Sequence, residues 1–188
     1  MRSGEKREAN NTIKNILISG TGGQGIIASG EFLSQALFLK GYEVMFGRSY
    51  GAEARGGSCR SEIIVSDHEI NDIQFERSDI LLCLSLPAFK KYIARAKPGS
   101  LVIIDASFTI TDEGTQGKNT VLCIPAQEIA VELGNPIVAN MVMLGALAKQ
   151  SDLVNLELLK EAVESNMRPS MKEINLDALQ MGYAYLEK

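Results

Sequence analysis

Four glycines within six residues mark the part of the chain where chemistry is easiest to infer. They follow the apolar run at 16–18, and the candidate phosphate-binding residues of this loop are Gly20, Gly22, Gly23, Gln24 and Gly25. Glycines at 20, 22 and 25 match G-x-G-x-x-G, in which successive glycines permit a tight turn, close approach to a pyrophosphate and close helix packing. We therefore predict a phosphate loop whose amides and following helix N-terminus face an anion. A purely structural tight turn is the alternative.

Arg48 stands where a nicotinamide-binding domain would place an acid. In such domains an Asp or Glu about 20 residues beyond the glycine loop holds the ribose hydroxyls. Here the predicted second strand ends in Phe46-Gly47-Arg48. Because a guanidinium binds phosphate with two parallel donors, arginine suits the extra phosphate of NADP or coenzyme A. A solvated surface cation is the alternative for Arg48.

A glycine-rich loop with both charge signs follows at 47–57. Its candidate partner-binding or ligand-binding residues are Tyr50, Gly51, Glu53, Arg55, Gly56 and Gly57. This composition packs poorly by itself, and loops of this length are usually functional. We expect the loop to contact a partner chain or a ligand rather than to serve as a linker.

The cysteines and the single histidine offer no metal site. Cys59, Cys83 and Cys123 are far apart and lack C-x-x-C spacing, so no disulfide framework, zinc site or iron–sulfur site is expected. Cys83 lies in an apolar run and is interpreted as a core residue. His68 lies in a polar turn, where a catalytic role is not expected.

Composition excludes several other classes of protein. The net charge of -4 and the absence of a basic run argue against nucleic-acid binding. No segment has the length and hydrophobicity of a membrane span or a signal peptide. We therefore expect a cytoplasmic protein with no membrane partner.

Strands and helices alternate along the chain. We predict a mobile leader at 1–12 and a single α/β domain at 13–188. The predicted strands beyond the first are 42–46, 60–66, 69–73, 79–84, 101–105 and 120–124, with 69–73 antiparallel to the strand before it. The predicted helices follow the glycine loop, run from Pro87 to Lys97-Pro98-Gly99, and cover 126–133, 137–150, 156–164 and the C-terminal region. The apolar central strands indicate a doubly wound, mostly parallel, Rossmann-like sheet with helices on both faces.

Three blocks of the sequence resemble the gamma subunits of 2-oxoacid:acceptor (ferredoxin or flavodoxin) oxidoreductases, the family of the pyruvate, 2-oxoglutarate, 2-oxoisovalerate and indolepyruvate enzymes. Residues 20–25 with Ala28 are similar to the family's GxGGQGxxxA opening. Residues 50–57 with Ser61 are similar to its YGxExRGG loop, the most specific of the three motifs. Residues 140–146 are similar to its N-x-x-x-L-G-A helix, and the resemblance spans about residues 13–185.

The resemblance implies a component of an enzyme complex. The reaction would be oxidative decarboxylation of a 2-oxoacid with coenzyme A, which gives an acyl-CoA, carbon dioxide and a reduced ferredoxin or flavodoxin. Thiamine diphosphate with Mg and the iron–sulfur clusters would lie on the alpha, beta and delta subunits of a heterotetramer. This chain would then hold no catalytic residue or metal ligand, and alone it would be inactive.

For this chain the resemblance implies coenzyme A binding and assembly. The glycine loop would receive the pyrophosphate, and Arg48 or Arg55 would pair with a phosphate. Glu53 would orient Arg55 or hold a neighbouring subunit. Asn140 would hydrogen-bond near the ligand, or would cap a helix after Pro136.

The type of complex is less defined than the family. A 2-oxoglutarate enzyme is favoured, because the chain is a free-standing gamma unit without a fused ferredoxin-like tail. A pyruvate-type gamma subunit, an assembly module without a ligand and a stand-alone NADP-linked reductase remain the alternatives.

Overall fold

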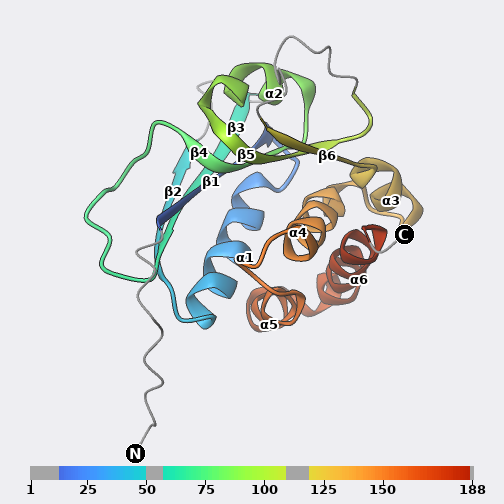
Figure 1. The fold of residues 1–188 in the computed structure, drawn as a ribbon. Helices are drawn as coiled ribbons and strands as arrows, with labels where there is room; N and C mark the ends of the chain where they lie inside the picture. The colour runs from blue at the N-terminus through green and yellow to red at the C-terminus, as the bar shows by residue number, and fades with distance from the viewer. Residues whose placement is uncertain (1–12, 50–56, 109–118, 187–188) are drawn as a thin grey trace, which may run out of the picture.

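A six-stranded sheet forms the centre of the protein, in the order β2-β3-β1-β4-β5-β6 (Figure 1). The computed structural model describes residues 13–49, 57–108 and 119–186, so the predicted leader at 1–12 lies outside them. The strands are β1 (Ile13–Thr21), β2 (Glu43–Ser49), β3 (Ser58–Ser66), β4 (Ser78–Cys83), β5 (Ala96–Asp105) and β6 (Thr120–Ile124). Both pairings of β3 are antiparallel, and all the others are parallel. The predicted mostly parallel sheet is confirmed.

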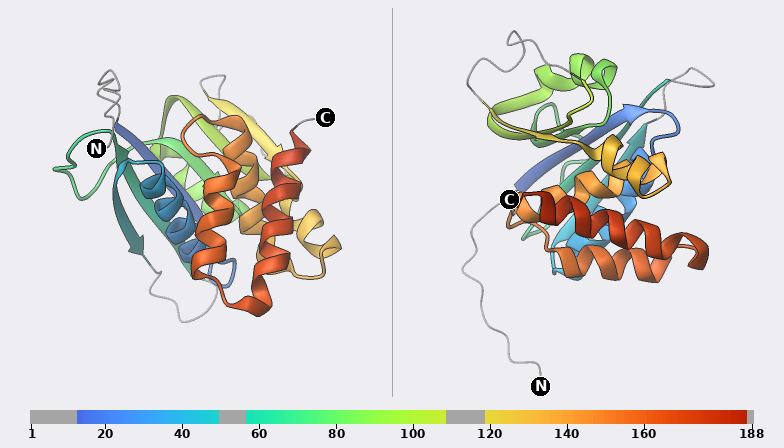
Figure 2. Two further views of the ribbon diagram at one scale, coloured as in Figure 1. Left: turned by 90° about the horizontal axis from the view of Figure 1, so that it is seen from below. Right: turned by 90° about the vertical axis from the view of Figure 1, so that its right-hand side faces the viewer.

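Helices cover the two faces of the sheet unequally. The helices are α1 (Ile26–Leu39), α2 (Leu86–Tyr92), α3 (Ala126–Glu132), α4 (Ala139–Gln150), α5 (Leu156–Asn166) and α6 (Pro169–Tyr185), with short 3-10 helices η1 (Ile93–Arg95) and η3 (Pro136–Val138). Figure 2 shows α2 on one side of the sheet and α4, α5 and α6 on the other. Alternation along β1 sends Ile16 and Ile18 into the larger core and Leu17 into the smaller core under α2. The prediction of helices on both faces is confirmed.

Two parts of the predicted element order are wrong. Residues 69–73 form an irregular connection between β3 and β4 rather than a returning strand. Lys97-Pro98-Gly99 do not end a helix, because α2 ends at Tyr92 and β5 begins at Ala96. The register shifts between the Ser78–Ala96 and Ile80–Leu101 pairs, and this irregularity accommodates a proline and a glycine within the strand.

Helices α4 and α6 pack with almost no space between their backbones. Every residue of α4 from Ala139 to Ala148 is buried. A Cβ atom on Gly145 would overlap the carbonyl oxygen of Leu179, and one on Gly182 would overlap that of Val142. The glycine of the third sequence block is therefore required by a helix crossing, and the crossing holds α6 in place.

Substitution of either glycine by alanine is expected to destabilise the fold. Because backbone rather than a flexible side chain blocks the added methyl group, Gly145→Ala or Gly182→Ala should lower the free energy of unfolding by about 1–3 kcal/mol or more. Gly47→Ala is the matched control, since its Cβ would lie 3.8 Å from the nearest atom, the carbonyl oxygen of Glu62. Urea unfolding followed by circular dichroism measures both. Equal midpoints for all three variants would contradict the steric argument.

Candidate functional site

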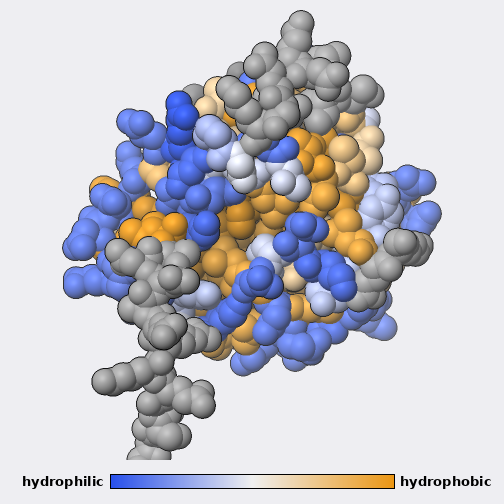
Figure 3. All heavy atoms as spheres, viewed as in Figure 1, coloured by the Kyte–Doolittle hydropathy of each residue, from blue (hydrophilic) through white to orange (hydrophobic). Residues whose placement is uncertain are grey.

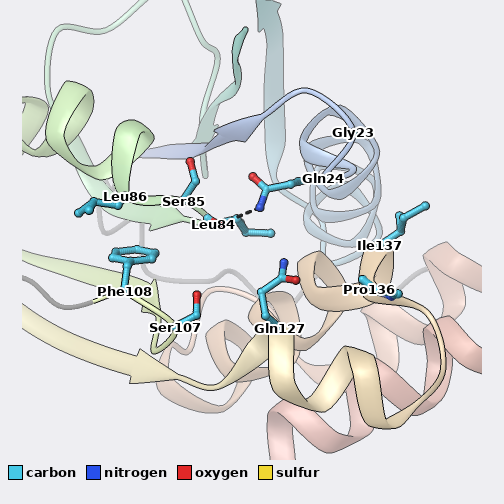
Figure 4. A pocket seen from close by; sticks show the side chains of 10 residues that line it. All are labelled: Gly23, Gln24, Leu84, Ser85, Leu86, Ser107, Phe108, Gln127, Pro136 and Ile137. Carbon is cyan, nitrogen blue, oxygen red and sulfur yellow. Dashed lines mark hydrogen bonds between the residues drawn. The ribbon is translucent and has the colours of Figure 1, made fainter. Parts of the chain in front are cut away.

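The chain leaves β1 and β4, which are neighbours in the sheet, toward opposite faces. Helix α1 follows β1 on one face, and α2 follows β4 on the other. In doubly wound sheets ligands bind in the crevice at the carboxyl ends of such strands. A cavity of about 580 Å³ lies there (Figure 4), lined by Gly23, Gln24, Leu84, Ser85, Leu86, Ser107, Phe108, Gln127, Pro136 and Ile137. The glycine loop thus forms one wall of a cavity at the switch point.

The first three glycines of the loop have three different environments. A Cβ on Gly20 would overlap the side chains of Gln24 and Ile26. The Gly22 amide donates to the carbonyl oxygen of Gly57 at 3.0 Å, so this amide is already used. Gly23 has a φ of +96° and open space around it, and it therefore presents backbone to the cavity.

The Gln24 side chain ties the ends of β1 and β4 together. Its Oε1 accepts from the Thr21 amide at 2.7 Å and from the Thr21 hydroxyl at 3.0 Å. Its Nε2 donates to the carbonyl oxygen of Leu84 at 2.8 Å (Figure 4). Sequence reasoning placed Gln24 in a phosphate cradle; the structure shows a side chain whose amide is engaged in holding two strand ends.

Asn140 fixes the left-handed turn that begins α1. Gly25, the residue before the helix, has a φ of +68°, and the Asn140 Nδ2 donates to its carbonyl oxygen at 2.9 Å. Asn140 is 3% exposed, and a Cβ on Gly25 would overlap its amide nitrogen. Its Oδ1 accepts the Met141 amide at 2.8 Å in the first turn of α4, whereas Asn135 accepts the Ile137 amide at the start of η3. The predicted roles of Asn140, near a ligand or as a helix cap, stay predictions.

Two serine hydroxyls donate hydrogen bonds to the first turn of α1. Ser61 on β3 donates to the Ile26 carbonyl oxygen at 2.9 Å, and Ser29 donates to the same oxygen at 2.9 Å. Gly30 lets the helix approach β3, since a Cβ there would overlap Ser61. The amides of the first turn have no partner within the helix, whereas the Ile26 carbonyl oxygen accepts both hydroxyls.

Asp105 organises the opposite wall of the cavity. It is 1% exposed at the end of β5, and its two carboxylate oxygens each accept a backbone amide at 2.8 Å, from Ser107 and from Gln127. This carboxylate therefore joins the chain after β5 to the start of α3. Sequence analysis did not single out Asp105, although an acid that ends an apolar strand was the available signal.

The lining of the cavity carries no charged side chain among the described residues. Leucine, isoleucine, proline and phenylalanine side chains predominate, with the hydroxyls of Ser85 and Ser107 and the amide of Gln127 among them (Figure 4). A negative charge bound here would be stabilised by backbone amides and by the dipole of α1, which places partial positive charge at its N-terminus.

Arg48 does not line this cavity. It lies on the edge strand β2, is 59% exposed, and pairs with Glu31 of α1 at 3.4 Å. Its role as a phosphate ligand stays a prediction. The loop residues Tyr50, Gly51, Glu53, Arg55 and Gly56 lie outside the described residues, and so their predicted roles stay predictions too.

The end of that loop is anchored at two places. Gly57 is buried, and its carbonyl oxygen accepts the Gly22 amide. The hydroxyls of Ser58 and Tyr92 are 2.9 Å apart. The structure thus brings the exit of the second sequence block against the glycine loop and α2.

Cys83 belongs to the core, as predicted. It is fully buried, its sulfur lies 3.3 Å from the Ser19 hydroxyl, and burial raises the pKa of its thiol to about 12. Cys123 is exposed and Cys59 is half-buried. Within the described ranges, no group of three or more His, Cys, Asp or Glu could hold a metal ion, and no helix has the length and hydropathy to cross a membrane.

A doubly wound α/β domain with a glycine loop at its switch point defines a nucleotide-binding class of fold. Comparison with known families makes the class specific: the model of the pyruvate ferredoxin/flavodoxin oxidoreductase family matches residues 15–185. The chain belongs to this family, which confirms the resemblance seen in the three sequence blocks.

Individual relatives agree with this assignment. The KorC subunit of 2-oxoglutarate synthase from Methanocaldococcus jannaschii is 40% identical over 172 residues, which is 90% of this chain and 92% of that protein. The gamma subunit of a keto/oxoacid ferredoxin oxidoreductase from Geobacter sulfurreducens PCA superposes with a TM-score of 0.78 at 33% identity, over 90% of this chain and 96% of its own.

A third relative contains the same domain within a longer chain. It is the 2-oxoglutarate:ferredoxin oxidoreductase of Magnetococcus marinus, solved with 2-oxoglutarate, coenzyme A and succinyl-CoA bound. The TM-score is 0.84 at 26% identity, and the match covers 95% of this chain but 32% of that one. The domain is therefore one part of a larger polypeptide in that enzyme.

The contact between Gly25 and Asn140 predicts a coupled pair of substitutions. Gly25→Ala should cost about 2–4 kcal/mol of unfolding free energy, through backbone strain and overlap with Asn140. In an Asn140→Ala background the overlap is absent, so the same substitution should cost only about 1–2 kcal/mol. A double-mutant cycle by urea unfolding measures the coupling; strictly additive effects would show that the two residues do not compete for space.

The cysteines predict a clear order of reactivity. Since the thiolate is the nucleophile, iodoacetamide at pH 8 should modify Cys83 at least about a hundredfold more slowly than Cys123 in the folded protein. Mass spectrometry of timed samples measures this ratio, and in concentrated urea the two rates should become similar. Rapid native-state modification of Cys83 would contradict its placement in the core.

Proposed function

We propose that this chain is the gamma subunit of a 2-oxoglutarate:ferredoxin oxidoreductase, and that its glycine loop and cavity hold the phosphate end of coenzyme A. The observation that carries the proposal is the 40% identity to a KorC subunit over nearly the full length of both chains. The complex would convert 2-oxoglutarate and coenzyme A to succinyl-CoA and carbon dioxide with reduction of ferredoxin.

The residues present fit a pyrophosphate. Gly23 is open toward the cavity, and the first-turn amides of α1 lie beside it without partners inside the helix. A helix N-terminus of this kind binds anions through amides and dipole together. Because Gly22 donates to Gly57, the cradle consists of Gly23 and the start of α1 rather than of every amide in the loop.

We assign the redox chemistry to other chains of the complex. Thiamine diphosphate with Mg and the iron–sulfur clusters would be carried by alpha, beta and delta subunits, and ferredoxin or flavodoxin would accept the electrons. The uncharged lining of the cavity supports this division, because it holds no acid–base pair among the described residues. When bound, coenzyme A supplies the thiol that accepts the acyl group, while this chain holds and orients the nucleotide.

One observation favours a second candidate, an assembly module without a ligand. The side-chain amide of Gln24 and the backbone amide of Gly22 both donate hydrogen bonds within the protein. This is expected of a loop whose role is only structural. The two candidates differ in whether Gly23 faces an anion.

A charged and an uncharged substitution at Gly23 separate these candidates. Asp and Asn have nearly the same shape and both tolerate positive φ. In the complete complex, Gly23→Asp should raise the KM for coenzyme A about 10- to 100-fold, because a carboxylate would meet the pyrophosphate, whereas Gly23→Asn should change it by less than about threefold. Steady-state kinetics measure both variants. Equal KM values for the two variants would favour the assembly module.

The substrate is tested on the purified complex with a panel of 2-oxoacids. Because the KorC relatives act in 2-oxoglutarate synthase by name, 2-oxoglutarate should give the highest kcat/KM, above pyruvate, 2-oxoisovalerate and indolepyruvate. Isothermal titration should show binding of coenzyme A to the complex and no tight binding of NADP to the isolated chain. A preference for pyruvate would reassign the complex, and tight NADP binding would support a reductase.

A further inference from the structure

A groove between α3 and α6 is bordered by one acidic and one apolar row of side chains. Its volume is about 500 Å³. Glu128 and Glu132 lie one helical turn apart on α3, and Met181 and Tyr185 lie one turn apart on α6. Both rows line the same depression, and each has the spacing of one helical turn.

The apolar row is more exposed than side chains of its kind usually are. Met181 is 36% exposed and Tyr185 38%, and Val131, on the same short helix as the acids, is 60% exposed. Ile137, which lines the cavity, is 54% exposed. Clustered exposed apolar side chains beside charged ones are typical of protein-binding surfaces.

The acidic row has no cation to neutralise it among the described residues. No ion pair within 4.0 Å involves Glu128 or Glu132 in the described ranges. Two carboxylates one turn apart repel each other modestly on a helix. An occupant with Lys or Arg side chains would relieve this repulsion, and a second copy of this chain, whose net charge is -4, would increase it.

The groove and the cavity share one helix. Gln127 of α3 lines the cavity, and the next residue, Glu128, lines the groove. Figure 2 shows α3 between the edge of the sheet and α6. A protein seated in the groove would therefore lie beside the mouth of the cavity.

The relatives indicate what must sit near that mouth. In the Magnetococcus marinus enzyme this domain is about a third of one chain, so its position relative to the remainder is helped by a covalent link. In the KorC and Geobacter sulfurreducens relatives the matched domain makes up 92% and 96% of a subunit, so the position of such a subunit depends on its surface. If the cavity holds coenzyme A, the subunit that carries the reacting centre must dock next to it.

We propose that the α3–α6 groove docks an amphipathic helical segment of the subunit that carries the reacting centre. Its apolar side chains would pack on Met181 and Tyr185, and its Lys or Arg side chains would pair with Glu128 and Glu132. The choice of this subunit rests on the proposed function, whereas the groove and its chemistry do not. Desolvated charge pairs at the rim of an apolar contact confer specificity and a salt-dependent association rate.

The test replaces the acidic row in the co-expressed complex. Glu128→Lys/Glu132→Lys should reduce the amount of this chain that co-purifies with its partner subunits at least tenfold. The matched control is Glu161→Lys/Glu164→Lys, which makes the same charge change on the exposed side of α5. A third variant, Met181→Ser/Tyr185→Ser, should weaken assembly without any change of charge.

Each outcome decides the proposal. Thermal unfolding of the isolated variants confirms that each is folded, and gel filtration of the complexes measures assembly. Full assembly of both groove variants would overturn the proposal, as would equal loss in the α5 control. A wild-type homodimer that the groove variants abolish would make a second copy the occupant and would overturn it too. Failure of the proposed function is seen separately, as absence of coenzyme A binding to a complex that assembles normally.

Discussion

The hydrogen bond from Asn140 to the carbonyl oxygen of Gly25 joins residues 115 positions apart in the chain, and the geometry of the site depends on it. Gly25 must adopt a left-handed conformation for β1 to turn directly into α1. The buried amide of Asn140 occupies the space that any Cβ at this position would need. This one contact therefore requires glycine at position 25. It also fixes where α1 begins and the direction in which the amides of α1 face.

The loop and its surroundings consist of backbone held by distant side chains. Gln24 ties two strand ends, Ser61 holds the first turn of α1, and Asp105 holds the start of α3. Each of these three side chains forms these hydrogen bonds with other parts of the protein. The lining of the cavity therefore consists of backbone, apolar side chains and the uncharged polar side chains of Ser85, Ser107 and Gln127 beside Gln24, a mixture typical of small-molecule sites.

Helix α3 connects the cavity with the groove on the outer surface. Its first turn is fixed by Asp105, and its outer face carries Glu128 and Glu132. Figure 3 shows apolar side chains gathered in the middle of the face seen in Figure 1, with hydrophilic side chains around them. Exposed apolar surface of this kind is typical of faces that contact other proteins.

The sequence by itself determined the order of most strands and helices, the glycine loop and the family, because periodicity and the spacing of glycines are local properties. Pro98 and Gly99 led to the wrong prediction of a helix end, where the structure has strand β5. Only the pairing of strands decides whether a bulge can accommodate these two residues. Tertiary structure alone decided what Gln24, Asn140 and Asp105 do. Their partners lie 60, 115 and 22 residues away, and a hydrogen bond across such distances depends on the packing of whole elements, which no local pattern encodes.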